Sequence, residues 1–179
     1  MIRAVAAFLL GAAACTAAGA LAQAAGAAGD APPCTAPGAL PADLAGWAGH
    51  RAEVQAAADA KAAGSARLPV GQVVDAALLP TPALRYAVAP GKPGGSVSHG
   101  GMFAFDVATP GTYRVSLGSH AWVDVVEGGK ALTSVAHGHG PACTTLAKMV
   151  DYRLRPGRHL LQIAANGEPG VAVMVSRRP

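Results

Sequence analysis

The sequence predicts an all-β protein: an antiparallel β-sandwich of jelly-roll type with about eight short strands and a short N-terminal helix. Three observations predict this class. Apolar and polar residues alternate with a period of two from Val70 onward. Pro-Gly, Gly-Gly and Asn-Gly pairs separate the alternating segments. No strand–helix–strand alternation is visible, and a charged share of 13 % is too low for a coiled coil or a charge-rich disordered chain.

The N-terminus has the pattern of a secretory signal peptide over residues 1–22. A short basic start is followed by the apolar run 4–10 and then by small residues, which predicts cleavage after Ala22. A membrane helix is disfavoured because glycines interrupt a stretch that is mostly Ala. Lipidation at Cys15, which follows Gly-Ala-Ala-Ala, is the alternative. We therefore expect a periplasmic or secreted chain with no transmembrane segment after cleavage.

The mature chain divides by composition. Residues 23–33 contain Ala, Gly and Pro with one Asp, and we expect a disordered leader. Residues 34–179 form a single β-sandwich domain, divided into an N-terminal arm at 34–67 and a strand-rich body at 68–179. Within the arm a short helix is expected at 41–48, with a proline at its first position and Leu44 and Trp47 on one face; the rest of the arm gives no clear pattern.

Five alternating segments of the body define half-buried strands. Their inward positions are Phe103, Phe105 and Val107; Tyr113, Val115 and Leu117; Val150, Tyr152 and Leu154; His159, Leu161 and Ile163; and Val171, Val173 and Val175. Segments 110–117 and 156–163 share the pattern Pro-Gly-polar-ring-x-apolar-x-apolar. His159 occupies the place of Tyr113 in this pattern, so we expect it to be a packed core histidine.

Cleavage at Ala22 leaves two cysteines, Cys34 and Cys143, in a chain bound for an oxidising compartment. Their disulfide would close a loop of about 110 residues, worth about 4 to 5 kcal/mol in the chain-entropy model. A thiol ligand or a catalytic cysteine is the rival interpretation. Cleavage also removes Arg3 from the 14 basic residues, which leaves 13 against 10 acidic ones, a balance of +3. This scattered charge predicts no nucleic-acid partner.

Histidines carry the clearest chemical signal. His137 and His139 stand at i and i+2 in a Gly-rich segment, and His99 lies in a second Gly-rich loop at 91–101. Asp124 enters the strand that carries Trp122. Imidazole and carboxylate groups suit Fe or Zn, so His137, His139, His99 and Asp124 are candidate metal ligands. A solvated loop without metal is the alternative.

Four segments of the body carry a family resemblance: residues 85–90, 93–96, 122–126 and 137–143, the last reading His-Gly-His-Gly-Pro-Ala-Cys. They are similar to a family of short exported bacterial proteins whose members sometimes carry the name homogentisate 1,2-dioxygenase. The ring-cleaving enzyme of that name is a longer cupin that holds Fe(II) with two His and a Glu, and this implies His137 and His139 as ligands. Cys143 and Thr144 stand where the cupin glutamate is expected, so Asp124 would have to supply the carboxylate. The strand pattern is also similar to carbohydrate-binding modules.

Two functional hypotheses follow from these residues. In the first, an exported non-catalytic sandwich binds a polar ligand, a glycan or another envelope component, through loops 91–101 and 136–142, with His99, Trp122 and Tyr86 as candidate binding residues. In the second, the histidines ligate a metal in an enzyme, conceivably a non-haem iron dioxygenase. A purely structural envelope protein is the third interpretation.

Overall fold

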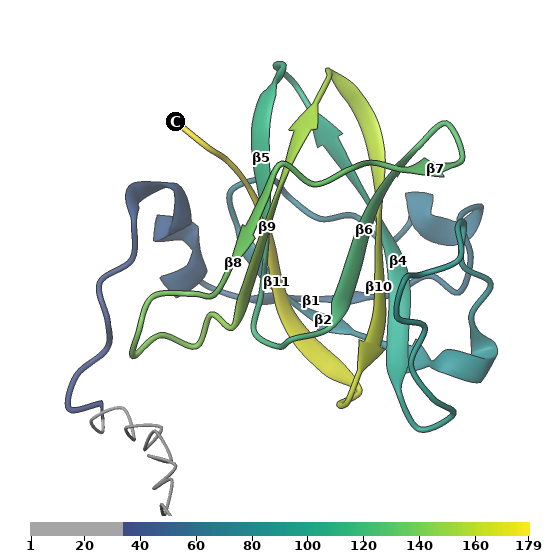
Figure 1. The fold of residues 1–179 in the computed structure, drawn as a ribbon, viewed down its shortest axis with the longest axis horizontal. Helices are drawn as coiled ribbons and strands as arrows, with labels where there is room; N and C mark the ends of the chain where they lie inside the picture. The colour runs from purple at the N-terminus through teal and green to yellow at the C-terminus, as the bar shows by residue number, and fades with distance from the viewer. Residues whose placement is uncertain (1–33) are drawn as a thin grey trace, which may run out of the picture. The chain divides into compact units, whose positions relative to one another are not determined.

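Two β-sheets face each other, as Figure 1 shows. Apolar side chains from both sheets form the core between them. The computed structural model describes residues 34–179, so the predicted signal peptide at 1–22, the leader at 23–33 and the lipidation site at Cys15 lie outside the described residues. The six-stranded sheet has the order β1 (Ala52–Gln55), β2 (Val73–Ala77), β11 (Gly170–Arg177), β5 (Gly111–Leu117), β9 (Lys148–Leu154) and β8 (Ala136–Gly138). The five-stranded sheet has the order β3 (Leu79–Pro80), β4 (His99–Val107), β10 (Gly157–Asn166), β6 (Trp122–Glu127) and β7 (Lys130–Ala131).

The predicted all-β sandwich class is confirmed. Every named strand pair is antiparallel except β1 with β2, which is parallel. The described residues hold eleven strands rather than about eight, because β1, β3, β7 and β8 are only two to four residues long and carry little alternation. β1 lies in the segment that the sequence assigned to the arm, so part of 34–67 belongs to the six-stranded sheet. The jelly-roll type stays a prediction.

The alternating residues fill the core as expected. Phe103, Phe105 and Leu161 are completely buried between the sheets. His159 is 2 % exposed and its ring stacks on Phe105 with the centroids 5.6 Å apart. Its Nε2 lies 2.9 Å from the carbonyl oxygen of Arg155. The prediction of a packed core histidine is therefore confirmed.

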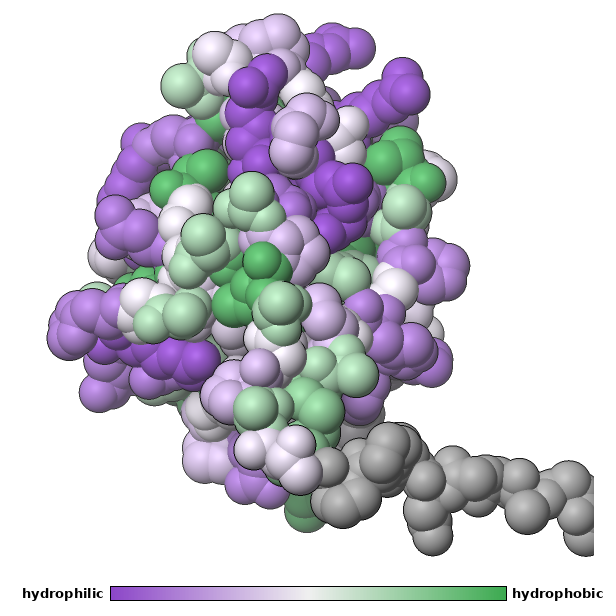
Figure 2. Space-filling model, turned by 90° about the vertical axis from the view of Figure 1, so that its left-hand side faces the viewer, coloured by the Kyte–Doolittle hydropathy of each residue, from purple (hydrophilic) through white to green (hydrophobic). Residues whose placement is uncertain are grey.

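A second, smaller core lies between the six-stranded sheet and a 3-10 helix, η1 (Ala42–Ala48). Leu44 and Trp47 of η1 are buried together with Val73, Leu146 and Met174. Two further 3-10 turns, η2 (Ala62–Gly64) and η3 (Thr81–Ala83), lie in the connections of the sandwich. Figure 2 shows that apolar and weakly polar residues gather at the centre of the face turned to the viewer, with hydrophilic residues around them.

Buried charges connect η1 to the six-stranded sheet. Arg114 on β5 donates from Nε and Nη2 to the two carboxylate oxygens of Asp151 on β9, at 2.8 and 3.0 Å. Its Nη1 reaches Asp43 in η1 at 3.2 Å, and Arg178 lies 3.4 Å from Asp151. The side chains of Arg114, Asp43 and Asp151 are at most 10 % exposed. A bidentate arginine–carboxylate pair of this kind fixes the relative orientation of its two strands.

Cys34 and Cys143 form the predicted disulfide, with their Cα atoms 5.4 Å apart. The bridge spans 109 residues of sequence and joins the start of the domain to the connection between β8 and β9. The backbone N–H of Gly38 donates to the carbonyl oxygen of Cys143 at 2.7 Å beside the bridge. The arm is thus held to the sandwich by a covalent bond, a backbone hydrogen bond and the buried face of η1.

Within residues 34–179, we find no helix of the length and apolar character needed to cross a membrane.

Candidate functional site

A pocket opens at the edge of the sandwich where β6 of one sheet faces β8 and β9 of the other. We call it the Trp122 pocket. Its volume is about 350 Å³, within the usual range for small-molecule sites. Apolar and polar side chains from both sheets line it: Trp122, Val123, Asp124, Leu132, Ser134, His137, Lys148, Val150 and Tyr152.

The pocket exists because β6 lacks a neighbouring strand over its first half. β7 pairs only with Val126 and Glu127, so the edge of β6 at residues 122–124 has no strand partner on that side within the described chain. Two side chains of β9 reach this edge. Lys148 Nζ donates to the carbonyl oxygen of Ala121 at 2.7 Å, and the Tyr152 hydroxyl donates to that of Val123 at 3.2 Å. These bonds hold the two sheets together at the pocket floor.

Trp122 is the aromatic wall of the pocket. It is half-buried, and its indole Nε1 donates to Asp124 Oδ2 at 2.9 Å. Lys148 Nζ lies 5.6 Å from the ring centroid, a cation–π distance. On another side the ring touches Gly91: a Cβ at that position would lie 2.6 Å from Trp122 Cζ2. The indole is therefore held in one orientation by a hydrogen bond, a cation and a close backbone contact.

Burial shifts the titration of the charged groups in the pocket. Desolvation raises the pKa of Asp124, and this outweighs the hydrogen bonds from Trp122 and Gln162 and the charge of Lys148, which act in the opposite direction. Desolvation lowers the pKa of Lys148, the neighbouring charge of Lys92 lowers it further, and Asp124 raises it. Burial, followed by the charge of Asp124, raises the pKa of Tyr152. The pocket thus holds one desolvated acid and one desolvated base.

The two Gly-rich loops predicted to carry the site both reach the start of β6. His137 on β8 is paired with Val150 and lines the Trp122 pocket. His139 follows β8, and its ring meets that of His120, just before β6, edge to face with the centroids 5.6 Å apart. In the other loop, Gly91 contacts the Trp122 ring, and the charge of Lys92 lowers the pKa of Lys148.

His99 and Tyr86, the other predicted binding residues, do not line the Trp122 pocket. His99 begins β4 and is paired with Asn166 of β10, and its Nδ1 is buried without a hydrogen-bond partner. Tyr86 packs against the main core. Its hydroxyl oxygen lies so close to Gly100 that a Cβ atom added there would be only 2.3 Å from it. Burial raises the pKa of the Tyr86 phenol. The Tyr86 ring is therefore part of the packing, and neither residue belongs to the Trp122 pocket.

The predicted metal ligands are not assembled into one centre. Across residues 34–179, no three His, Cys, Asp or Glu side chains lie where they would hold one ion. Asp124 and His137 line the same pocket, but the His139 ring contacts that of His120, and His99 lies at the start of β4 beside β10. Cys143 is bonded to Cys34 in the disulfide and so has no thiolate to offer a metal. The residues present therefore do not fit the two-histidine, one-carboxylate iron or zinc site that the sequence suggested.

Sequence reasoning missed Lys148 and Ser134, which both line the pocket. A signal for Lys148 was present, because it continues the alternation of Val150 and Tyr152 by one step and so lies on the inward face of β9. Ser134 stands between β7 and β8, in a connection without periodicity, and no pattern indicated it.

In comparisons of the sequence with known proteins, no family model and no curated protein match this chain.

Proposed function

We propose that this protein is an exported, non-catalytic β-sandwich protein that binds a glycan, or a polar envelope component of the same hydrogen-bonding character, in the Trp122 pocket. The observation that carries the proposal is the presence of an oriented indole, a carboxylate and an ammonium group around one small pocket, in Trp122, Asp124 and Lys148. Of the two aromatic residues named as binding candidates, Tyr86 packs on the core and does not line the pocket, which leaves Trp122.

The chemistry of the lining supports a polyhydroxylated ligand. An indole offers a flat apolar surface for the C–H face of a sugar ring, and its N–H is already satisfied by Asp124. Asp124 accepts hydrogen bonds from ligand hydroxyls, while Lys148, Ser134 and His137 donate to ligand oxygens. A mostly apolar pocket with a few convergent polar groups is typical of small-molecule sites.

Export is supported by the signal-peptide pattern at 1–22 and by the disulfide. Disulfides persist in oxidising compartments, and the Cys34–Cys143 bridge joins residues 109 positions apart. N-terminal sequencing of protein recovered from a periplasmic fraction tests this step, and we expect a mature start at Gln23.

Binding is tested with the mature chain, residues 23–179, on a glycan panel followed by titration calorimetry of the best ligand. We expect Trp122→Leu and Asp124→Asn each to weaken binding at least about tenfold, since each removes one direct contact of about 1.4 kcal/mol or more. Glu127→Gln is the matched control, because Glu127 is exposed on the same strand and does not line the pocket.

Two results would overturn the proposal. One is a folded wild-type chain that binds no glycan on the panel, and the other is a glycan whose affinity is the same in Trp122→Leu, Asp124→Asn and wild type. Circular dichroism of each variant establishes that the comparison is made between folded proteins.

A further inference from the structure

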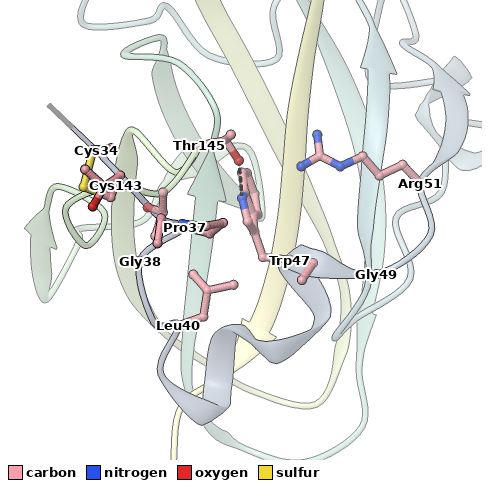
Figure 3. A pocket seen from close by; sticks show the side chains of 13 residues that line it. Cys34, Pro37, Gly38, Leu40, Trp47, Gly49, Arg51, Cys143 and Thr145 are labelled. Atoms are coloured by element: carbon pink, nitrogen blue, oxygen red, sulfur yellow. Dashed lines mark hydrogen bonds between the residues drawn. A yellow bond between two sulfur atoms is a disulfide. The ribbon is translucent and has the colours of Figure 1, made fainter.

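A second and larger hollow lies on the outer side of the six-stranded sheet, beside η1. We call it the Trp47 groove. Its volume is about 530 Å³, and Figure 3 shows its walls. The arm contributes Pro37 and Leu40, the end of η1 contributes Trp47, the disulfide lies beside Pro37, and Thr145 lies beside Trp47. It shares no lining residue with the Trp122 pocket.

The charge in the groove is of one sign. Arg51 is the only charged residue among its lining residues, and no acidic side chain lines it. The Arg51 guanidinium carbon lies 5.4 Å from the centroid of the Trp47 ring, so the cation sits over the apolar wall. In Figure 3 the guanidinium points toward the indole and Thr145.

Arg51 retains donors for a ligand. Its one ion pair in the described chain joins Nη1 to Asp75 Oδ1 at 3.3 Å, and the two side chains are 31 % and 56 % exposed. A pair as exposed as this is weak, because solvent screens it. A guanidinium presents five N–H donors in a planar fork that matches a carboxylate. The Arg51 guanidinium therefore has N–H groups available for an incoming carboxylate, and the exposed Asp75 carboxylate competes for them only weakly.

The apolar wall is fixed rather than adaptable. Trp47 is buried in the second core with Leu44, and its Nε1 donates to Thr145 Oγ1 at 3.0 Å. The ring edge left at the groove, together with Pro37 and Leu40, forms an apolar surface next to the Arg51 cation. The volume lies within the range of small-molecule sites, which favours a small ligand over a folded partner.

We propose that the Trp47 groove is a second binding site, independent of the Trp122 pocket, for a small amphipathic carboxylate: an acid group on the Arg51 guanidinium and a ring-sized apolar body against Trp47, Leu40 and Pro37. This chemistry is selected because the groove places a cation with no acidic neighbour in the lining next to a fixed apolar wall. The hydroxyl groups of a neutral sugar pair only with the threonine hydroxyls of the groove, and the Arg51 cation repels an amine.

The disulfide makes the site conditional on oxidation. Cys34 and Cys143 both line the groove, and Pro37 and Leu40 follow Cys34 in the arm. Reduction of the disulfide frees the arm at Cys34, just before Pro37 and Leu40, so the oxidised chain is the form that binds the carboxylate ligand.

The test uses 3-phenylpropionate as the probe and 3-phenylpropylamine as its charge-reversed counterpart. The chain has two tryptophans, so an isotope-labelled sample gives two indole N–H signals by nuclear magnetic resonance, assigned once with Trp122→Phe. We expect 3-phenylpropionate to shift the Trp47 signal in a saturable way and the amine to bind at least about tenfold more weakly. Equal binding of acid and amine, or a shift confined to Trp122, would overturn the proposal.

Three variants sharpen the test. Arg51→Gln is expected to weaken 3-phenylpropionate binding at least about tenfold, and Asp75→Asn is expected to strengthen it a few fold by removing the competing carboxylate. Arg153→Gln, an exposed arginine that does not line the groove, is the control and is expected to leave the affinity unchanged. Unchanged affinity in a folded Arg51→Gln, or unchanged or weaker binding in Asp75→Asn, contradicts the role assigned to the guanidinium.

Discussion

The two tryptophans of this protein occupy hollows that are built in different ways. Around Trp122, strands of both sheets supply most of the walls, and hydrogen bonds from Lys148 to Ala121 and from Tyr152 to Val123 hold them. Around Trp47, the walls come from the arm and the connection between β8 and β9, held by a disulfide and buried charges. The cations differ too, because Lys148 is desolvated beside Asp124, whereas Arg51 faces a groove without acids. One region is thus part of the sandwich itself, and the other depends on how the arm is attached.

The largest effect is expected at the buried charges under η1. Asp151→Asn leaves Arg114 buried with one fewer full negative charge, and breaking such a pair costs about 3 to 5 kcal/mol. We expect the free energy of unfolding to fall by that amount in urea denaturation. The matched control is Asp75→Asn, which breaks the exposed pair with Arg51 and is expected to cost at most about 1 kcal/mol. Equal losses in the two variants would show that burial does not distinguish these pairs.

Removal of the disulfide is expected to affect ligand binding at the Trp47 groove far more than at the Trp122 pocket. Cys34→Ser combined with Cys143→Ser is expected to lower the free energy of unfolding by about 2 to 5 kcal/mol, because the unfolded chain regains the entropy of a loop spanning 109 residues. The Trp47 groove should lose 3-phenylpropionate binding, since two of its lining residues are the cysteines. Glycan binding at the Trp122 pocket should change less than twofold. Parallel loss at both sites, measured by titration below the melting temperature, would contradict the separation.

A smaller effect is expected at the contact between the Gly-rich loop and Trp122. Gly91→Ala places a Cβ 2.6 Å from the indole, so the loop or the ring must move, at a cost of about 1 to 3 kcal/mol. Gly95→Ala is the control in the same loop, because a Cβ there meets no atom within 4 Å. Thermal unfolding and glycan titration of both variants measure the difference. If Gly91→Ala behaves like Gly95→Ala, the loop does not fix the ring.

The same contrast explains how much the sequence predicts. Regular alternation predicts the long strands and the core, because inward apolar residues are separated by one polar position, as in Tyr113 and Val115 or Leu161 and Ile163. The disulfide follows from a count of cysteines. Alternation does not reveal β1 and β8, which are four and three residues long, contain no aromatic residue and carry little periodicity.

The candidate site is predicted only in part, because a pattern along the chain does not tell which strands meet. His137 and Asp124 line one pocket because β8 and β6 lie at the same open edge of opposite sheets. His99 belongs to a loop of the same composition, yet its strand pairing places it beside Asn166. The order of strands in a sheet comes from long-range packing, and the three-ligand metal hypothesis was wrong for that reason.

The smallest effect is expected in the pH dependence of the Trp122 pocket. Burial raises the pKa of Asp124 in the folded protein above its value in the unfolded chain, so the folded state binds that proton more tightly. Stability contributed by the protonated acid is therefore present at low pH and is lost as the pH rises from the unfolded pKa through the folded one. Asp124→Asn removes this titrating group, so the urea midpoint of the wild type should fall relative to that of the variant as the pH rises through this window, and the difference should be constant above it. Glycan affinity in the wild type should change in the opposite direction, because the ionised carboxylate is the stronger acceptor for ligand hydroxyls, and should rise over the same interval. Midpoints and calorimetric titrations between about pH 3 and pH 7 measure both trends. A wild-type affinity that is constant over this interval would remove Asp124 from the ligand contacts and leave Trp122 and Lys148 to account for binding.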